Sequence, residues 1–322
     1  MFNIVRYCSR AFVLLLAVLG VLALGVNADR AGESAPSAER KIGVLLVCHG
    51  SRSESWRKAL LAVEASVRPK LMTNDAVQCL RTAFMEYTEP SIATRLKEFD
   101  AEGFTDIVIV PLFLTVSPHT FDDIPTIIGK KADPQSRESL RIEGIERYSP
   151  KANVVLTPNL DYPGVLKDNV LRRVRSLSTH PNEEGLVLIA YGDETYEKEW
   201  TSLLTGVGDF VRQNTGIGCC SIGWCGHLVH YDPNKTTEAV EEVLKTKKKA
   251  VVIPVLLAQD ENFQIKIIGG GIEKVPDSSE RVEYRPDSIL PDPNVENWVV
   301  RIANQYAIEI ISGRPLAASQ HP

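Results

Sequence analysis

Cysteine is scarce in this sequence, and its spacing is irregular. The chain has six cysteines among 322 residues and contains no Cys-x-x-Cys pair. Five of them lie beyond the amino-terminal segment, an odd number without a repeated spacing, which argues against a disulfide framework. Cys219, Cys220 and Cys225 lie in apolar sequence, where cysteine usually packs as a small hydrophobic residue. A thiolate metal site is therefore the weaker interpretation.

The sequence also lacks an apolar run of full membrane-spanning length. Its longest apolar segment, residues 11–26, has 16 residues, whereas a spanning helix needs ~20. Arg6 and Arg10 precede this run, and Val26-Asn27-Ala28 provides the small residues that signal peptidase accepts. We therefore predict an export signal over residues 1–28, a flexible leader over 29–41 and a periplasmic location, with an uncleaved membrane anchor as the alternative.

Positive charge is in deficit. The formal net charge is −5, and removing Arg6 and Arg10 with the signal takes it to about −7. We therefore expect no nucleic acid partner, and no stable membrane insertion once the signal is cleaved. Gly269–Gly271 lack the spacing of a nucleotide-binding fingerprint, and we predict no organic cofactor. The sequence leaves the oligomeric state open.

The rest of the chain alternates apolar strands with amphipathic helices. The predicted strands are 44–47, 77–85, 106–113 and 154–156, and the predicted helices are 54–71, 91–99, 121–128 and 162–177. Continuously apolar strands are typical of a parallel sheet covered on both faces. We predict an α/β fold of two parallel-sheet lobes, residues 42–180 and 181–311, with a cleft between them and a disordered tail over 312–322.

The second half of the chain repeats the first. Three segments recur at nearly the same offset: residues 186–192 match the segment ending at Gly50 at 142, Pro233 matches Pro90 at 143, and 251–257 match 108–114 at 143. Residues 285–291 match 157–163 at 128, which implies extra residues near 130–146 in the first half. An offset kept over three successive strands indicates an internal duplication.

The second copy lacks three residues of the first that could bind a metal ion. These residues follow three predicted strands, and their counterparts differ: His49 against Tyr191, Glu86 against Val229, and His119 against Asn262. A purely structural role would not explain why all three are replaced while the apolar strands remain. We therefore predict that the chemistry resides in the first lobe, and that the second lobe is degenerate.

Two imidazoles and one carboxylate at neighbouring strand ends can converge on one divalent cation. Three protein ligands would leave coordination positions open for a substrate. The alternative is that each histidine is hydrogen-bonded locally, but the degenerate copy favours a shared site. These ligand types accept cobalt, ferrous iron and nickel alike, so they do not select among the three.

Three motifs then show a resemblance. Residues 45–52 (LLVCHGSR), 84–92 (FMEYTEPSI) and 110–115 (VPLFLT), the last leading to His119, resemble the class II tetrapyrrole chelatases, in particular the sirohydrochlorin cobaltochelatases and ferrochelatases of cobalamin and siroheme biosynthesis. The resemblance is strong over residues 41–180 and architectural beyond them. It implies that His49 and His119 hold the incoming metal, that Glu86 assists in metal binding or proton removal, and that the cleft holds the macrocycle.

The resemblance implies a lyase-type chelatase that inserts cobalt or ferrous iron, with nickel as a further option, into sirohydrochlorin. Gly50, Ser51, Arg52 and Ser117 are candidate substrate-binding residues, because acidic side chains of the macrocycle could dock there; Arg52 is equally suited to cap the sheet edge. Pro118 departs from the glycine that relatives usually have before the histidine. Export raises an alternative, a periplasmic metal- or tetrapyrrole-binding protein without turnover.

His227 and His230 form a second candidate metal site. They are spaced as His-x-x-His with Cys225 nearby, and they follow the strand equivalent to the one that bears Glu86. The alternative is a structural role between the lobes.

Overall fold

The computed structural model describes residues 40–160 and 162–314. The predicted export signal, nearly all of the leader and the tail beyond Arg314 lie outside these residues and stay predictions. Within the described part of the chain, none of the helices combines the length and the apolar character that a membrane crossing requires.

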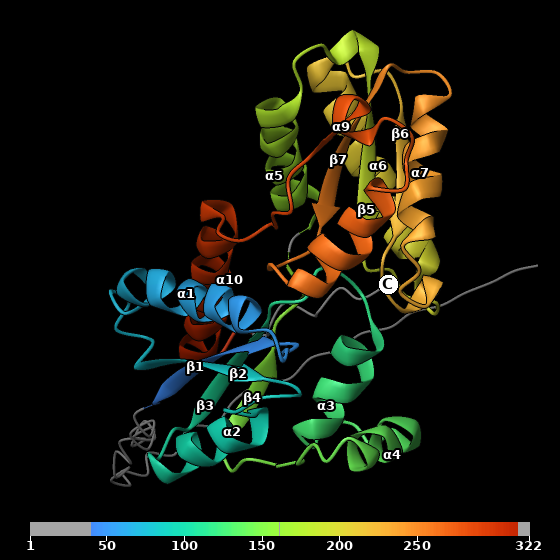
Figure 1. Ribbon diagram of the computed structural model, residues 1–322. Coiled ribbons are helices and arrows are strands. Elements are labelled where there is room, and N and C mark those ends of the chain that lie inside the picture. Colours follow the sequence, from blue (N-terminus) through green and yellow to red (C-terminus); the bar gives the residue numbers. More distant parts are fainter. Residues whose placement is uncertain (1–39, 161, 315–322) are drawn as a thin grey trace, which may run out of the picture. The chain divides into compact units, whose positions relative to one another are not determined.

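Strands and helices alternate along the chain (Figure 1). The first half contains β1 (Ile42–Cys48), α1 (Glu54–Leu71), β2 (Cys79–Phe84), α2 (Ile92–Ala101), β3 (Asp106–Pro111), η1 (His119–Asp123), α3 (Ile124–Ile127), α4 (Pro134–Ile142) and β4 (Asn153–Leu156). The second half contains α5 (Tyr162–Leu177), η2 (Pro181–Glu183), β5 (Glu184–Ala190), α6 (Glu197–Thr215), β6 (Cys220–Trp224), η3 (His227–Val229), α7 (Asn234–Leu244), β7 (Lys249–Val255), η4 (Asn262–Gly269), α8 (Gly270–Ile272), α9 (Ser278–Arg281), β8 (Val282–Tyr284) and α10 (Pro293–Ser312).

Both sheets are parallel and have the same strand order. The first is ordered β2-β1-β3-β4 and the second β6-β5-β7-β8. Val47 pairs with Pro111 in the first sheet, and the corresponding residues Ile189 and Pro254 pair in the second. The predicted α/β fold with two similar parallel sheets is confirmed.

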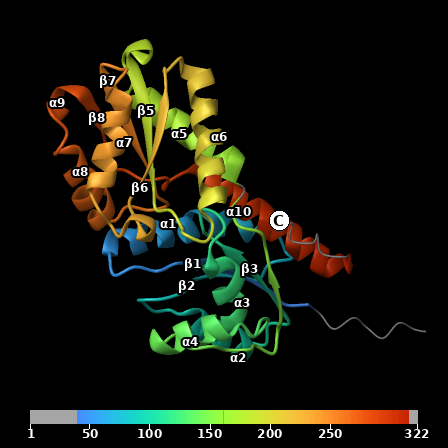
Figure 2. The same ribbon diagram turned by 90° about the vertical axis from the view of Figure 1, so that its right-hand side faces the viewer.

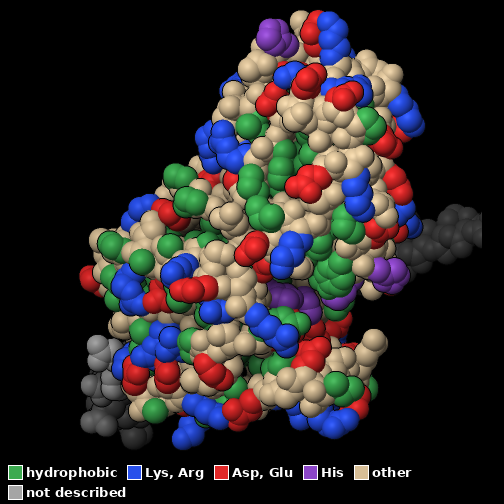
Figure 3. All heavy atoms as spheres, in the orientation of Figure 1, with side chains coloured by type: hydrophobic (Ala, Val, Ile, Leu, Met, Phe, Trp, Pro, Cys, Tyr) green, Lys and Arg blue, Asp and Glu red, His purple; other side chains and the backbone are tan. Residues whose placement is uncertain are grey.

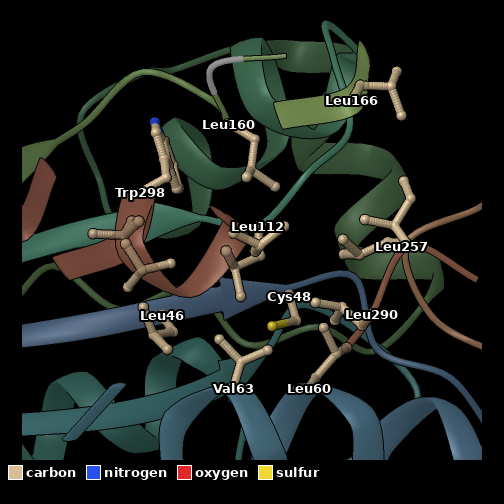
Figure 4. Packing of buried hydrophobic residues seen from close by; sticks show 14 of the residues in the cluster. Leu46, Cys48, Leu60, Val63, Leu112, Leu160, Leu166, Leu257, Leu290 and Trp298 are labelled. Atoms are coloured by element: carbon tan, nitrogen blue, oxygen red, sulfur yellow. The ribbon is translucent and has the colours of Figure 1, made fainter. Parts of the chain in front are cut away.

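Helices cover both faces of the first sheet, so β1 is buried along its whole length. Leu46 and Cys48 point to the face on which Leu60 of α1 and Trp298 of α10 pack (Figure 4). Val47 lies in a separate apolar cluster together with residues of α2 and α3. Each large apolar side chain buried in this way contributes roughly 1.5–3 kcal/mol, so the strand is firmly anchored up to its carboxyl end.

Capping side chains mark where several helices begin. The side chain of the residue before the helix accepts a hydrogen bond from a backbone N–H of the first turn in four cases: Ser53 for α1, Ser91 for α2, Asp133 for α4 and Asp292 for α10. Each cap satisfies one of the N–H groups that have no partner within the helix.

The first lobe is completed by a helix from the far end of the chain, and α5 packs against the second lobe instead of the first. Helix α5 packs against α6 and β7, while α10 packs against α1 and β3. Figures 1 and 2 show green α5 beside the second sheet and red α10 beside α1. The predicted boundary at residue 180 is thereby corrected: the first lobe is β1 to β4 with α10, and the second lobe is α5 to β8. Sequence periodicity identifies the apolar face of a helix but does not identify the sheet that it covers.

A polar cluster joins α5 to the segment between β8 and α10. Arg173 of α5 forms an ion pair with Asp287, which follows β8. Asn169 of α5 donates a hydrogen bond of 2.6 Å to Asp292, the residue that caps α10, and Arg172 lies 2.8 Å from the same carboxylate. Helix α5 of the second lobe is thus bonded to the segment that leads to α10 of the first lobe.

The two copies match at their strand ends, with one shift. The Glu86 amide donates to the His49 carbonyl at 3.1 Å, and the Gly226 amide donates to the Tyr191 carbonyl at 3.0 Å. The counterpart of Glu86 is therefore Gly226 and not Val229, because the η3 turn adds three residues between this point and the shared proline. The carboxylate is still missing from the second copy, as the sequence comparison predicts.

Candidate metal centre

The three predicted ligands converge from three strand ends. His49 directly follows β1, Glu86 lies just beyond β2, and His119 begins η1 after β3. One ligand atom from each residue lies within 4.8 Å of the other two. A divalent ion at about 2.0–2.2 Å from its ligands holds them roughly 3–4 Å apart, so small side-chain rotations would complete the site.

Backbone hydrogen bonds extend the β1–β2 pairing into the loops and set His49 beside Glu86. The Met85 amide donates to the Cys48 carbonyl at 2.8 Å, and the Glu86 amide donates to the His49 carbonyl at 3.1 Å. Gly50 has a φ of 91°, and a Cβ atom there would lie 2.0 Å from the Glu86 carbonyl oxygen. Glycine at this position therefore allows the two loops to close on each other.

An oxygen atom orients each imidazole through Nδ1. In His49 this nitrogen lies 3.1 Å from the carbonyl oxygen of Gly50, and in His119 it lies 2.8 Å from Oδ2 of Asp123. Because a carbonyl oxygen and a carboxylate oxygen only accept, we assign the N–H to Nδ1 in both rings. Each Nε2 then offers a lone pair to a metal ion, and the Asp123 carboxylate fixes the orientation of the His119 ring.

The contact between His49 and Glu86 requires a cation. Nε2 of His49 lies 2.9 Å from Oε1 of Glu86, whose side chain is 7% exposed. With Nδ1 protonated, a neutral His49 would turn a lone pair toward the carboxylate, so a proton or a metal ion must lie on Nε2. Burial alone lowers the pKa of His49, but the hydrogen bond and charge of Glu86, with smaller effects of Gly50 and Glu143, outweigh burial and raise it above 6.5.

Aromatic rings border the site. The rings of His49 and His119 meet edge to face, with centroids 4.9 Å apart. The ring of Phe113 lies 6.3 Å from the first and 6.2 Å from the second, and the ring of Tyr87 lies 6.2 Å from His49. Figure 3 shows histidine side chains gathered where the two lobes meet, in a hollow of the surface. Aromatic rings thus border the two imidazoles, which remain about one third exposed.

The structure adds two acidic residues that the sequence analysis does not assign to the site. Asp123 orients His119, and their spacing of four residues in one helical segment is the signal for this contact. Glu143 follows α4, where burial and the charges of Glu86 and Asp123 raise its pKa. It lies in the extra segment near residues 130–146, so the second copy offers no counterpart for comparison.

The predicted substrate-binding residues differ in their exposure and in the hydrogen bonds that they already form. Ser51 donates a hydrogen bond of 3.0 Å to Asp260 and so links the two lobes beside the site. Arg52 is exposed, and its guanidinium lies over the ring of Tyr87, 5.4 Å from the centroid. The Ser117 hydroxyl is buried without a hydrogen-bond partner among the described residues. Arg52 is therefore the predicted side chain that offers an accessible charge.

The predicted site at His227 and His230 does not form a cluster of metal ligands. Both ring nitrogens of His227 lie within hydrogen-bonding distance of the Tyr231 hydroxyl, at 3.0 and 3.1 Å. The Tyr231 hydroxyl is also 3.2 Å from that of Tyr191, while Cys225 is fully buried. In the described part of the chain, the one group of three metal-binding side chains is that of the first lobe. His227 belongs instead to an aromatic cluster.

Comparisons with known proteins point to one family. The CbiX family model matches residues 43–177, which include all three predicted ligands. The sirohydrochlorin cobaltochelatase of Methanococcoides burtonii is 36% identical over 107 residues, covering 33% of this chain and 77% of that protein. The sirohydrochlorin cobaltochelatase of Methanothermobacter thermautotrophicus is 34% identical over 97 residues, covering 30% of this chain and 64% of that protein.

A solved structure extends the likeness over both lobes. The sirohydrochlorin chelatase SirB from Bacillus subtilis subspecies spizizenii, in complex with cobalt, is similar with a TM-score of 0.59 and 18% sequence identity. The match covers 84% of this chain and 97% of that one. At this identity the similarity establishes the shared fold.

Proposed function

The chain belongs to the CbiX family of class II tetrapyrrole chelatases, and we propose on this basis that it inserts a divalent metal ion into sirohydrochlorin. The observation that carries the proposal is the convergence of His49, Glu86 and His119 within 4.8 Å. Three protein ligands leave coordination positions open, so an ion held there can pass to another ligand. The metal is a substrate, and cobalt or ferrous iron is the leading choice because the similar proteins are named cobaltochelatases and the resemblance extends to ferrochelatases, while the ligand set itself accepts nickel as well.

Metal insertion must remove two protons from the macrocycle. As the ion leaves the protein for the ring, two pyrrole N–H bonds break and the metal–nitrogen bonds form. The departing ion frees Nε2 of His49, which then accepts one proton. The Glu86 carboxylate accepts the second proton, and the ion pair between His49 and Glu86 forms again once Glu86 has released that proton to water. The raised pKa of His49 supports this assignment, because it strengthens the imidazole as a base.

An insertion assay tests the proposal. Purified protein is mixed with sirohydrochlorin and with Co²⁺, Fe²⁺ under anaerobic conditions, or Ni²⁺, and the change in macrocycle absorbance is followed. We expect multiple turnovers with at least one ion, and rates near the spontaneous one for His49→Ala and His119→Ala. His180→Ala is the matched control, since this exposed histidine lies outside the site. A wild-type rate equal to the spontaneous rate would overturn the proposal.

The assay also separates catalysis from storage. A periplasmic protein that binds metal or tetrapyrrole without turnover would give one equivalent of product or complex per chain and then stop. Turnover beyond one equivalent excludes that alternative.

We also propose that the chain is exported and loses residues 1–28. The support is the apolar segment preceded by Arg6 and Arg10 and followed by small residues. Expression of the full chain in a Gram-negative bacterium should yield periplasmic protein whose mass corresponds to a start at Asp29. An intact mass in the cytoplasm or the membrane fraction would contradict this.

A further inference from the structure

A cavity of about 370 Å³ lies between α3 and the extra segment of the first copy, near residues 130–146. Figures 1 and 2 show α3 and α4 side by side at the lower end of the first lobe. A second hollow of about 480 Å³ shares Arg137 and Arg147 with this cavity. Hollows of about 300–1,000 Å³ are large enough for small-molecule ligands. The three predicted metal ligands do not line the cavity, so it is separate from the metal centre.

The lining of the cavity is basic. Its charged side chains, among the described residues, are all cationic: Lys130, Lys131, Arg137 and Arg147. Lys131 pairs with Asp122. In the described part of the chain, the side chains of the other three form no ion pair and no hydrogen bond. Neighbouring cations without partners repel one another, and an anion between them would turn this repulsion into attraction.

The acidic side chains near the cavity already have partners. Asp133 caps α4 by accepting a hydrogen bond of 2.7 Å from a backbone amide of its first turn. Glu138 accepts two hydrogen bonds from Arg141, at 2.6 and 2.9 Å. Glu146 pairs with Lys97 at 2.6 Å. These carboxylates are therefore not paired with the cations of the cavity.

Two hydroxyl groups line the same cavity. The Thr126 side chain of α3 is 1% exposed, and its Oγ1 has no hydrogen-bond partner among the described residues. A buried hydroxyl without a partner destabilises the folded protein unless a ligand or solvent satisfies it. The Ser149 hydroxyl likewise forms no hydrogen bond with another described residue. Both groups can donate an O–H to an anion.

A glycine allows the segment before β4 to close the cavity. Gly129 has a φ of 77°, and a Cβ atom there would clash with the Ser149 hydroxyl. The Tyr148 amide donates a hydrogen bond of 2.9 Å to the Ile127 carbonyl, and its ring packs on the apolar cluster of the first lobe. The residues on either side of it, Arg147 and Ser149, line the cavity.

We propose that this cavity is a binding site for a small molecule that carries phosphate groups. Arg137, Arg147 and Lys130 supply the positive charge, and Thr126 supplies a buried hydrogen-bond donor. A guanidinium can bind two phosphate oxygens at once, and a lysine adds a point charge. A phosphate group concentrates about two negative charges on one centre, which suits converging cations better than a single carboxylate does. The site does not depend on the proposed metal insertion.

Calorimetric titration with pyrophosphate tests the site. Protein and buffer are first freed of divalent metal ions, so that pyrophosphate cannot bind through a metal ion. We expect one pyrophosphate per chain, with an affinity that falls as the salt concentration rises, because the cations are exposed. Citrate spreads its charge over separate carboxylates and should bind about tenfold more weakly.

Single substitutions locate the bound anion. Arg137→Ala and Arg147→Ala should each weaken pyrophosphate binding about tenfold, because each removes a charged hydrogen-bond donor. Thr126→Val removes the hydroxyl and should weaken binding about 2- to 10-fold. Lys198→Ala, at an exposed lysine of α6 in the second lobe, is the matched control for the loss of one positive charge. His119→Ala should bind pyrophosphate as the wild type does, since the metal centre is separate.

Thermal unfolding without ligand verifies that each variant is folded. A wild-type protein without saturable pyrophosphate binding at millimolar concentration would overturn the proposal. Unchanged affinity in both arginine variants would overturn it as well. Loss of binding in His119→Ala would place the anion at the metal centre and contradict the assignment to the cavity. Citrate that binds as tightly as pyrophosphate would refute the preference for phosphate.

Discussion

At the scale of single residues, a proton and a metal ion compete for Nε2 of His49, which faces Glu86. Nε2 of His49 faces the Glu86 carboxylate at 2.9 Å, and the contact is favourable when a cation lies on that nitrogen. In the metal-free protein this cation is a proton, which is why the pKa of His49 is raised. A metal ion must displace the proton before it can bind.

This competition predicts that metal affinity falls as the pH falls. The His49 pKa lies above 6.5, so protonation already opposes binding at a pH where an ordinary histidine would be neutral. Below the raised pKa, each pH unit should weaken Co²⁺ binding about tenfold, and above it the affinity should level off with respect to His49. Co²⁺ titrations followed by visible absorption between about pH 5.5 and 8.5 measure this. Affinity that stays constant down to the lower limit would contradict the assignment.

The same pKa shift makes the opposite contribution to the stability of the metal-free fold. A raised folded-state pKa stabilises the folded protein fully below the unfolded value of 6.5, and this contribution is lost as the pH rises through the folded-state value. A low pH therefore favours the protonated, metal-free ion pair of His49 and Glu86. A higher pH removes the proton from His49 and leaves Nε2 able to bind a metal ion.

Asp123 supplies the second residue-scale prediction. Its carboxylate accepts a hydrogen bond from Nδ1 of His119 at 2.8 Å and so directs Nε2 to the metal centre. Asp123→Ala should weaken Co²⁺ binding about 10- to 100-fold, because His119 loses the hydrogen bond that orients its ring. Asp122→Ala is the matched control, since this neighbouring carboxylate pairs with Lys131 instead. Equal Co²⁺ affinity in the two variants, measured by competition with a chromophoric chelator, would exclude the positioning role.

At the scale of elements, the loops after β1 and β2 must touch for the site to form. A Cβ atom on Gly50 would lie 2.0 Å from the Glu86 carbonyl oxygen, and the residue also has a positive φ. Gly103 has a φ of 74° but has open space around its Cβ position. Alanine at Gly103 therefore adds backbone strain alone, whereas alanine at Gly50 adds both backbone strain and a clash between the loops.

We expect Gly103→Ala to cost about 1 kcal/mol of unfolding free energy and to leave Co²⁺ binding unchanged. Gly50→Ala should cost about 2–4 kcal/mol and weaken Co²⁺ binding at least tenfold, since His49 and Glu86 must move apart. Denaturant unfolding and Co²⁺ titration of both variants measure the two effects. Similar behaviour of the two variants would show that the contact at Gly50 is unimportant.

The strands and the convergence of His49, Glu86 and His119 were predictable because their patterns are local or repeated. Apolar strands of four to seven residues mark a covered parallel sheet, and the offset between copies fixes which strand ends correspond. The same offset isolates His49, Glu86 and His119 by their absence from the second copy. A three-residue shift at η3 is too small to be detected in that offset, so the counterpart of Glu86 was misplaced.

Contacts between segments distant in sequence were not predictable. Nothing in the amphipathic pattern of α5 or α10 identifies which sheet each helix covers. Glu143 lies in an extra segment, and the hydrogen bond from Ser51 to Asp260 forms only when the lobes are brought together. These features depend on tertiary packing, for which a single sequence carries no direct signal.

At the scale of the whole molecule, the first lobe depends on α10, which returns to it from the end of the chain. Seven residues of α10 are buried, among them Val295, Trp298 and Val299, and they pack on the first sheet. Without α10, the part of β3 and α1 that it covers would be exposed to water. Each large apolar residue of α10 contributes roughly 1.5–3 kcal/mol of burial, a large sum beside the usual 5–15 kcal/mol stability of a domain.

This dependence predicts how fragments of the chain behave. A fragment of residues 40–180, cut at the boundary that the sequence suggests, should show no cooperative thermal unfolding and weak Co²⁺ binding, because α10 is missing and α5 has lost its sheet. Residues 40–160 joined through a flexible linker to 292–314 restore α10 and its cap, and should unfold cooperatively and bind Co²⁺. Circular dichroism and Co²⁺ absorption compare the two. If the 40–180 fragment unfolds as sharply as the joined one, α10 is not required to complete the first lobe.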